Sequence, residues 1–381
     1  KQGIGWDQML YINFEDERLI NMEVSDLNLL LETFARIYGT ERPILFLDEL
    51  QNIYGWEKFV RRLADNKYRL YITGSNAHML SAEIATTLGG RFIMKEVYPY
   101  SFTEYLEARQ VPLDMTAQTA TATRAILQHH FDEYLQYGGF PEGAHLQSKR
   151  DYLMSVYQKI YLGDIAARHR IENSFALRFL FKKLSESIMQ PMSFTRLTNL
   201  ITSTGSKISK ATVINYMDYA KEAYLIFPIK NISSHLSERE SNPKYYFVDN
   251  GIISLLTLNA ESALLENTIA MELLRRYGQE NQVFFYNEKV EVDFYIPETT
   301  TAIQVCLYPH ESDETWRRET EALIRFSKHL PCSQCLLITM NDEETLTVDG
   351  VTIQLIPAWK WLINPKRIGA SDALMQRCDV Y

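Results

Sequence analysis

The chain has 381 residues, of which 46% are hydrophobic and 23% charged, which suits two or three domains with ordinary apolar cores. This composition excludes collagen-like, disordered and disulfide-scaffold proteins, and apolar runs such as 43–47 are far shorter than the roughly 20 residues of a membrane span. Four cysteines and the lack of a visible signal segment predict a cytoplasmic protein without membrane contact. The net charge of −9 restricts any nucleic-acid contact to a local patch.

The first hundred residues alternate between strand-like and helix-like segments. β-Branched and aromatic residues predict strands at 10–14, 43–47 and 69–73, and apolar residues at helical spacing predict helices at 26–38 and 56–66. This alternation predicts a parallel sheet covered by helices, in which ligands bind beyond the carboxyl ends of the strands. The polar residues expected at that edge are Asp48, Glu49, Ser75 and Asn76.

Residues 44–49 read Ile-Leu-Phe-Leu-Asp-Glu, which is typical of the second phosphate-site motif of P-loop ATPases. The strand is apolar because a central strand is covered on both faces. Asp48 can hold Mg²⁺ against nucleotide phosphates, directly or through water, and Glu49 can orient the attacking water. The alternative is a buried strand that ends in a solvated acidic loop.

Two further positions extend this constellation. The third strand ends in TGSN at 73–76, where Ser75 or Asn76 can contact a γ-phosphate or the catalytic water. Arg91 follows Gly89-Gly90 and a predicted helix at 82–88, and it can act as an arginine finger on a neighbouring subunit's nucleotide. A surface salt bridge is the alternative role for Arg91.

The rest of the chain divides into three parts by its patterns. Residues 101–190 are nearly all helical, with predicted helices at 103–109, 124–137, 152–168 and 174–189. Residues 191–250 contain two helices at 194–202 and 209–223, then strands at 224–229 and 244–248, which is the order of a winged helix. Residues 251–381 predict a separate small α/β domain with a helix at 264–276, strands at 283–286, 290–296 and 302–307, a helix at 315–329, and strands at 336–339 and 351–356.

Several motifs in one order resemble a large prokaryotic family of AAA-type ATPases with a C-terminal restriction-endonuclease-like domain. The motifs are YINFEDERL, LFLDELQNIYGWEKFVRRLAD, YITGSNAHMLSAEIATTLGGRF, VYPYSFTEYL, YGGFPE and YLGDIAAR. The resemblance covers essentially the whole chain. It implies an α/β multidomain protein: a parallel-sheet AAA-type core (1–100) that binds ATP and Mg²⁺, a helical lid (101–190), a winged helix (191–250) and a nuclease-like domain (251–381). By position it assigns the Mg²⁺-linked acid to Asp48, the catalytic glutamate to Glu49, the polar sensor to Ser75 or Asn76, and the arginine finger to Arg91.

The chain departs from this family in one respect, because G-x-x-x-x-G-K-[ST] occurs nowhere in its 381 residues. The nearest string, Thr204-Gly205-Ser206-Lys207, lacks the first glycine and lies between two predicted helices rather than after a strand. An ATPase of this type needs a loop that cradles the phosphates. In the family that loop precedes the stretch that matches YINFEDE, so we expect it upstream of Lys1.

The predicted recognition helix of the winged helix begins near residue 209. Lys207, Lys210 and Asn215 lie at or near its N-terminal end, where lysines suit phosphate contacts and an asparagine can read an adenine edge. We therefore consider DNA as a partner for this segment. A packing or protein-contact role is the alternative.

The C-terminal pattern is compared with nucleases in which two strand acids hold Mg²⁺ and a lysine assists the nucleophile. Glu266, Asp293 and Gln304 correspond in position to the metal-side residues, and Cys306 stands where the lysine is expected. Glutamine is a weaker metal ligand than a carboxylate, and cysteine cannot replace a lysine cation. The sequence thus predicts a degenerate, inactive nuclease fold used for binding or assembly. The single pair Cys332-x-x-Cys335 argues against a zinc site in this region, since neither a second cysteine pair nor a nearby pair of histidines accompanies it in the sequence.

The function predicted from these patterns is Mg-ATP binding and slow hydrolysis that drives a conformational or oligomeric switch, with homo-oligomers as one form of that switch. Two alternatives stay open: a non-hydrolysing DNA-binding or interaction scaffold, and a nuclease gated by ATP.

Overall fold

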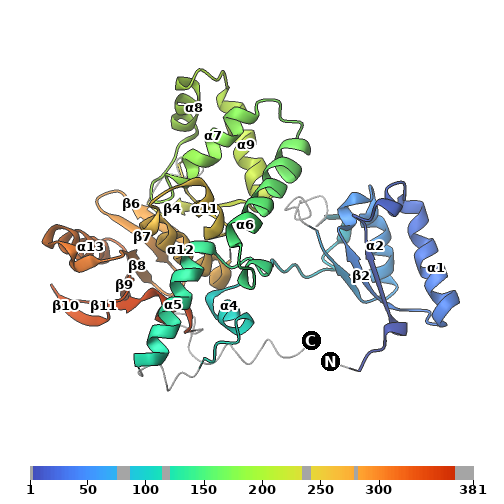
Figure 1. The fold of residues 1–381 in the computed structure, drawn as a ribbon, viewed down its shortest axis with the longest axis horizontal. Helices are drawn as coiled ribbons and strands as arrows, with labels where there is room; N and C mark the ends of the chain where they lie inside the picture. Colours follow the sequence, from blue (N-terminus) through green and yellow to red (C-terminus); the bar gives the residue numbers. More distant parts are fainter. Residues whose placement is uncertain (1–2, 75–85, 114–120, 234–241, 279–281, 365–381) are drawn as a thin grey trace. The chain divides into compact units, whose positions relative to one another are not determined.

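The computed structural model describes residues 3–74, 86–113, 121–233, 242–278 and 282–364. It divides into two compact units, Lys1–Val97 with Glu222–Tyr224, and Tyr98–Lys221 with Leu225–Tyr381 (Figure 1). The sequence-based boundaries near 190 and 250 fall inside the second unit. Within the described ranges, none of the helices combines the length and apolar character that crossing a membrane requires.

The first unit contains a parallel three-stranded sheet in the order β1-β2-β3. The strands are β1 (Met9–Asn13), β2 (Ile44–Asp48) and β3 (Leu70–Ile72), and the helices are α1 (Leu27–Tyr38) and α2 (Trp56–Asp65). Short 3₁₀ turns complete it at Trp6–Gln8, Glu17–Leu19, Val24–Asp26 and Leu50–Asn52. Leu45 and Leu47 of β2 pack with Leu27 of α1 and with Phe59 and Leu63 of α2 in one apolar core. The parallel sheet predicted from the alternating pattern is therefore confirmed.

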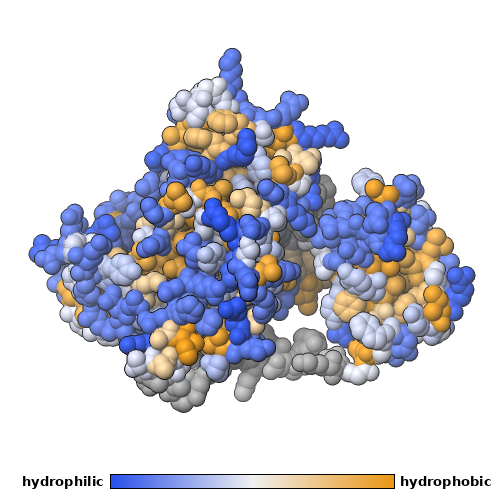
Figure 2. Space-filling model, in the orientation of Figure 1, coloured by the Kyte–Doolittle hydropathy of each residue, from blue (hydrophilic) through white to orange (hydrophobic). Residues whose placement is uncertain are grey.

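The other face of this sheet is open among the described residues of the first unit. Tyr11, Phe46 and Tyr71 are in register across the three strands, and the rings of Phe46 and Tyr71 stack at 4.9 Å. Tyr11 is 61% exposed and Tyr71 42%. Figure 2 shows a hydrophobic area on the visible surface of this unit. A parallel sheet is normally covered on both faces, so this face is unusual among such sheets.

The second unit begins with a largely helical half. Its helices are α4 (Phe102–Ala108), α5 (Thr121–Tyr137), α6 (Lys149–Gln158), α7 (Ser174–Ser185), α8 (Phe194–Ser203) and α9 (Lys210–Glu222), with a 3₁₀ turn at Glu142–Ala144. The single helix predicted at 152–168 is instead α6 followed directly by a π-helix, Lys159–Ala167. Such a widened turn is a local change in hydrogen bonding, which apolar spacing alone does not reveal.

The remainder of the second unit is built on an eight-stranded mixed sheet in the order β10-β11-β9-β8-β7-β6-β4-β5. Its strands are β4 (Ile226–Asn231), β5 (Lys244–Phe247), β6 (Phe284–Asn287), β7 (Glu291–Ile296), β8 (Thr301–Val305), β9 (Gln334–Thr339), β10 (Glu344–Val348) and β11 (Val351–Pro357). Its helices are α11 (Asn250–Leu256), α12 (Glu261–Tyr277), α13 (Asp313–Ser327) and α14 (Ala358–Leu362), with a 3₁₀ turn at Pro309–Glu311. The sequence patterns did not predict β10, α11 or α14.

The hairpin expected as the wing of a winged helix belongs to this large sheet. β4 and β5 pair antiparallel, and β4 also pairs in parallel with β6, with Lys230 opposite Phe284 and Asn231 opposite Phe285. The segment assigned to 191–250 and the segment after 250 therefore share one sheet, which explains why they form one compact unit.

A buried polar network explains the YGGFPE motif. Asp249 is the N-cap residue before α11, and its carboxylate accepts hydrogen bonds from the backbone N–H groups of Gly139 at 2.7 Å and Gly251 at 2.8 Å. A Cβ on Gly139 would lie 2.2 Å from the carbonyl oxygen of Tyr100, so this position tolerates only glycine. Asn250 Nδ2 extends the network to the carbonyl oxygen of Leu135 at 2.8 Å. The end of α5 is thereby fixed to α11.

Candidate functional site

The first cluster lies at the carboxyl edge of the sheet in the first unit, around Asp48. Asp48 ends β2, and its Oδ2 accepts a hydrogen bond from the hydroxyl of Tyr11 at 2.9 Å. Its Oδ1 accepts a hydrogen bond from the hydroxyl of Thr73, which follows β3. The hydrogen bond to Asp48 raises the pKa of Tyr11, because an ionised phenol could no longer donate it. Hydroxyl groups from β1 and from the end of β3 thus both donate to the carboxylate at the end of β2.

Glu49 follows Asp48 in an unusual backbone conformation. Its φ of 54° lies in the left-handed region, which non-glycine residues seldom occupy. Its backbone N–H donates to Thr73 Oγ1 at 3.3 Å, and its Oε2 accepts from Gln51 Nε2 at 2.5 Å. Such local strain is common where a side chain must be aimed at a ligand.

Of the other residues predicted for this site, the structure describes Arg91. Arg91 Nε pairs with Asp65 Oδ1 at 2.6 Å, and both side chains are between two-fifths and one-half exposed. This ion pair is the surface salt bridge considered as the alternative role of Arg91. Ser75 and Asn76 lie outside the described residues.

The Asp48 cluster suits a hydrated magnesium ion. A carboxylate at the end of a parallel strand is a hard oxygen ligand, and the Tyr11 hydroxyl on its Oδ2 can exchange for metal-bound water. Bound Mg²⁺ would supply charge neutralisation at nucleotide phosphates. Asp48 would hold it, and Glu49 is the adjacent carboxylate that can orient a water molecule.

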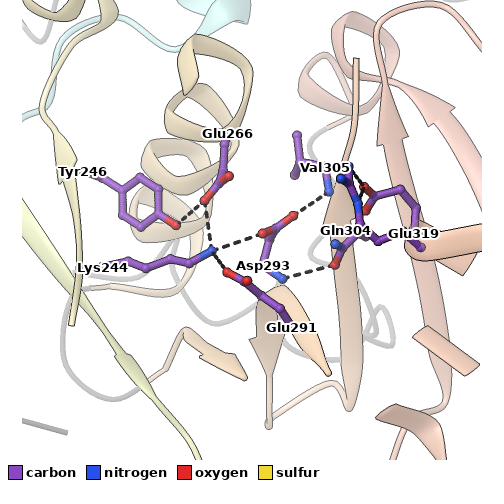
Figure 3. A network of polar contacts seen from close by, with 9 residues as sticks. Lys244, Tyr246, Glu266, Glu291, Asp293, Gln304, Val305 and Glu319 are labelled. Atoms are coloured by element: carbon purple, nitrogen blue, oxygen red, sulfur yellow. Dashed lines mark hydrogen bonds and ion pairs between the residues drawn. The ribbon is translucent and has the colours of Figure 1, made fainter. Parts of the chain in front are cut away.

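The second cluster lies in the large sheet and is centred on a buried lysine (Figure 3). Lys244, the first residue of β5, is 0% exposed. Its Nζ lies 3.0 Å from Glu291 Oε1, 3.2 Å from Asp293 Oδ1 and 3.4 Å from Glu266 Oε1. Burial alone would lower the pKa of Lys244, but the three carboxylates raise it above its ordinary value. Lys244 is therefore an ammonium ion at neutral pH.

The two buried acids of this cluster are held by other groups as well. Glu266 Oε1 accepts from the hydroxyl of Tyr246 at 2.7 Å, and Asp293 Oδ2 accepts from the backbone N–H of Val305 at 3.0 Å. Burial raises the pKa of Glu266, and Lys244 acts in the opposite direction. Within the described ranges, Glu266 Oε2 is buried without a hydrogen-bond partner.

Gln304 connects the lysine cluster to a neighbouring cleft. Its Oε1 accepts from the backbone N–H of Asp293 at 3.3 Å, and its side chain also hydrogen-bonds Glu319 of α13. The cleft has a volume of about 580 Å³ and is lined by these three residues, by Cys306 and by Arg318. Burial and then the nearby Glu319 raise the pKa of Cys306 to about 11, so this thiol is neutral at physiological pH.

The residues of the second cluster do not fit a catalytic metal ion. The structure brings Asp293 and Gln304 together, but the ammonium of Lys244 lies against both Asp293 and Glu266, where a metal ion would need to bind. Among the described residues, no group of three or more His, Cys, Asp and Glu side chains is arranged to hold a metal ion. The positive charge that balances these carboxylates is supplied by the protein itself.

Comparison with known proteins places the first cluster in a recognised domain. Residues 2–106 match the family model described as an AAA domain, and residues 128–263 match a domain of unknown function, DUF8612. The chain is 36% identical over 372 residues to the uncharacterized protein MJ1544 of Methanocaldococcus jannaschii, covering 94% of this chain and 82% of that protein. It belongs to the MJ1544 family. The first unit of this member is accordingly an AAA-type, ATPase-like domain.

Other similarities are weaker. An uncharacterized protein of Haemophilus influenzae is 29% identical over 369 residues, covering 94% of this chain and 88% of that protein. The Walker-type ATPase PABY2304 of Pyrococcus abyssi aligns with a TM-score of 0.39 at 12% identity, covering 65% of this chain and 72% of that one. The Orc1 protein of Aeropyrum pernix, solved in complex with DNA, aligns with a TM-score of 0.28 at 13% identity, covering 70% and 79%.

The residues predicted to contact DNA lie on the surface of this MJ1544-family protein. Lys207 precedes α9, Lys210 is its first residue, and Asn215 lies one turn further along. All three side chains are exposed. Ser209 Oγ accepts from the backbone N–H of Thr212 at 3.0 Å and so caps the start of α9.

The sequence patterns did not single out several residues that the structure places in the two clusters, among them Thr73, Tyr11, Lys244 and Glu319. Thr73 lies within the TGSN string, so its position at the end of a predicted strand was an available signal. Tyr11 lies on β1, the strand that pairs with β2 on the side opposite β3. Lys244 and Glu319 gave no such signal. They lie far from Asp293 in sequence and reach it only through the packing of β5 and α13.

Proposed function

We propose that this protein binds Mg-ATP in its AAA-type domain and hydrolyses it slowly to drive a conformational or oligomeric switch. The observation that carries the proposal is the placement of Asp48 at the carboxyl edge of a parallel sheet, between the hydroxyls of Tyr11 and Thr73. Glu49 lies next to it in a strained conformation. The match of residues 2–106 to an AAA domain supports the same chemistry.

Each residue has a separate role in this proposal. Asp48 holds Mg²⁺ through water, and Glu49 orients the attacking water. Thr73 connects the Asp48 carboxylate to the backbone of Glu49, so it relays the position of one acid to the other. Ser75 or Asn76 contacts the γ-phosphate. Arg91 leaves its ion pair with Asp65 to reach the nucleotide of a neighbouring subunit.

Nucleotide binding also needs a loop that cradles the phosphates, which the 381 residues do not contain as a G-x-x-x-x-G-K-[ST] string. The proposal therefore depends on a phosphate-binding segment other than such a string. Equilibrium binding of ATP in the presence of Mg²⁺ tests it, and a protein that binds no nucleotide would contradict the proposal.

For the second unit we propose a binding role rather than strand cleavage. The ammonium of Lys244 neutralises Asp293 and Glu266, the acids that a nuclease would use for metal binding. The neutral thiol of Cys306 cannot assist a nucleophile as a lysine does. The exposed Lys207 and Lys210 at the start of α9 favour phosphate backbones as the ligand of the winged-helix segment.

Two assays on the full-length protein test these proposals. The first assay measures Mg²⁺-dependent ATP turnover. Turnover that is lost in Glu49→Gln while nucleotide binding is retained supports the ATPase. DNA affinity without any turnover favours a non-hydrolysing scaffold. Incubation of plasmid DNA with Mg²⁺ or Mn²⁺, with and without ATP, tests the second unit. Metal-dependent cleavage that Asp293→Ala removes would overturn the binding role and favour the gated nuclease.

A further inference from the structure

A pair of thiols in the second unit is separate from both clusters. Cys332 lies in the turn before β9, and Cys335 is the second residue of that strand. Their Sγ atoms are 3.4 Å apart, which is van der Waals contact. A disulfide bond is about 2.05 Å long, so the two sulfurs have to move closer together to form one.

The two thiols differ in their surroundings. Cys335 is 3% exposed and packs in the core of the large sheet, in register with Ala302 of β8 and Ile353 of β11. Cys332 is partly exposed at the edge of that core. A hydrogen bond from Cys335 lowers the pKa of Cys332 to about 7, and the same interaction raises the pKa of Cys335. Cys332 is thus the accessible thiol with substantial thiolate character, and Cys335 is the protected one.

The turn that carries Cys332 is fixed on both sides. The hydroxyl of Tyr295 donates to the carbonyl oxygen of Pro331 at 2.7 Å, and the backbone N–H of Ser333 donates to the carbonyl oxygen of Thr300 at 2.9 Å. These contacts fix the turn and so hold the first sulfur next to the second. The described structure places no histidine, cysteine or acidic group with them in a metal-binding arrangement.

We propose that Cys332 and Cys335 form a reversible dithiol–disulfide site whose co-substrate is a small-molecule disulfide such as oxidised glutathione. The Cys332 thiolate attacks one glutathione sulfur, the disulfide bond of glutathione breaks, and glutathione thiolate leaves and takes up a proton. Cys335 then loses its proton and attacks the sulfur of Cys332, which releases the second glutathione. The protein loses two electrons and two protons, and one oxidised glutathione becomes two reduced molecules.

The test uses the full-length protein equilibrated in buffers of increasing oxidised glutathione, followed by iodoacetamide, trypsin and mass spectrometry. Trypsin places Cys332 and Cys335 together in peptide 329–360, Cys306 in 290–317, and Cys378 in 378–381. We expect peptide 329–360 to lose two hydrogens and resist alkylation, while Cys306 stays alkylated. Oxidation of Cys306 in the same buffers as the pair, or a pair that stays reduced throughout, would overturn the proposal.

Single variants separate the two roles. Cys335→Ser should stop at the mixed disulfide, with one glutathione on Cys332, and Cys332→Ser should leave Cys335 unmodified. Cys306→Ser is the matched control and should form the disulfide as the unaltered protein does. Equal glutathionylation of Cys332→Ser and Cys335→Ser would refute the assignment of the attacking thiol.

A measurement on the unaltered protein avoids dependence on the folding of variants. At pH 7, iodoacetamide should modify Cys332 faster than Cys306, because the pKa of Cys332 is lowered and that of Cys306 is raised, so Cys332 carries the larger fraction of thiolate. As pH rises, the Cys332 rate should level off before the Cys306 rate does. Equal rates for Cys332 and Cys306 would contradict the proposal.

Discussion

Replacing Lys244 with methionine tests the electrostatic basis of the second cluster. Methionine has a similar length and no charge, so the variant leaves Glu266 and Asp293 buried without their cation. At an effective dielectric constant of about 20, each contact near 3.3 Å is worth about 5 kcal/mol, or about 10 kcal/mol for the two buried acids. Desolvation of the ammonium offsets most of this, so we expect a net loss of about 3–5 kcal/mol at pH 8. Glu291 is 45% exposed and adds little because water screens it.

The loss in Lys244→Met should depend on pH with a definite sign. Without the ammonium, burial dominates and the folded-state pKa of Glu266 rises further above its unfolded value. The folded state then binds more protons than the unfolded state between these two pKa values, so its stability falls as pH rises through that window. The destabilisation should therefore be smaller at pH 5 than at pH 8.

Hydrogen exchange of the full-length protein, resolved to peptides from β5 and α12, measures this local stability. Lys221→Met is the matched control, because Lys221 forms an exposed pair with Asp218 at 2.6 Å and its loss should cost under about 1 kcal/mol. Lys244→Met combined with Glu266→Gln should recover part of the stability. If Lys244→Met lost no more than the control, or lost equally at both pH values, the account of the lysine cluster would be wrong.

Four further predictions concern the lysine cluster, the Asp48 cluster, the start of α9 and the contact of Gly139. Lys244→Met should bind Mn²⁺, as seen by electron paramagnetic resonance, because Glu266 and Asp293 then lack a cation. If the variant bound no Mn²⁺, the view that the Lys244 ammonium takes the place of a metal ion would be wrong. Thr73→Val should lower ATP turnover about 10- to 100-fold with little change in nucleotide affinity, since it removes the bond to a charged acceptor, and unchanged turnover would exclude the relay. Lys207→Glu with Lys210→Glu should weaken duplex DNA binding and reduce its salt slope by about two, whereas an unaffected affinity would exclude α9 as the DNA contact. Gly139→Ala should cost about 2–3 kcal/mol in urea unfolding because its Cβ meets the Tyr100 carbonyl oxygen, and a neutral change would contradict this close approach of Gly139 to Tyr100.

The first unit was largely predictable because its signals are local. The strand ending in Asp48 is fully apolar, and its neighbours end in polar residues, so a parallel sheet with acids at one edge follows from alternation alone. The hydrogen bonds from Tyr11 and Thr73 need the exact register of three strands. Periodicity gives the faces of strands but not their register, so these partners had to come from the structure.

The second unit was less predictable because its decisive contacts are distant in sequence. Lys244 meets Asp293 across 49 positions, and β4 joins β6 across a whole helical segment. A lysine in a predicted wing strand is expected in solvent, and only the packing of β5 against α12 buries it. The π-helix at 159–167 depends on hydrogen bonding within one helix, which apolar spacing does not report.

The central claim is that Asp48 and Glu49 form the catalytic edge of an ATPase. The most direct measurement is steady-state ATP turnover by the full-length protein with Mg²⁺, compared between the unaltered chain and Glu49→Gln, with nucleotide binding measured in parallel. We predict Mg²⁺-dependent turnover in the unaltered protein and loss of turnover with retained binding in Glu49→Gln. Equal turnover in both proteins, or no nucleotide binding by the unaltered one, would contradict the claim.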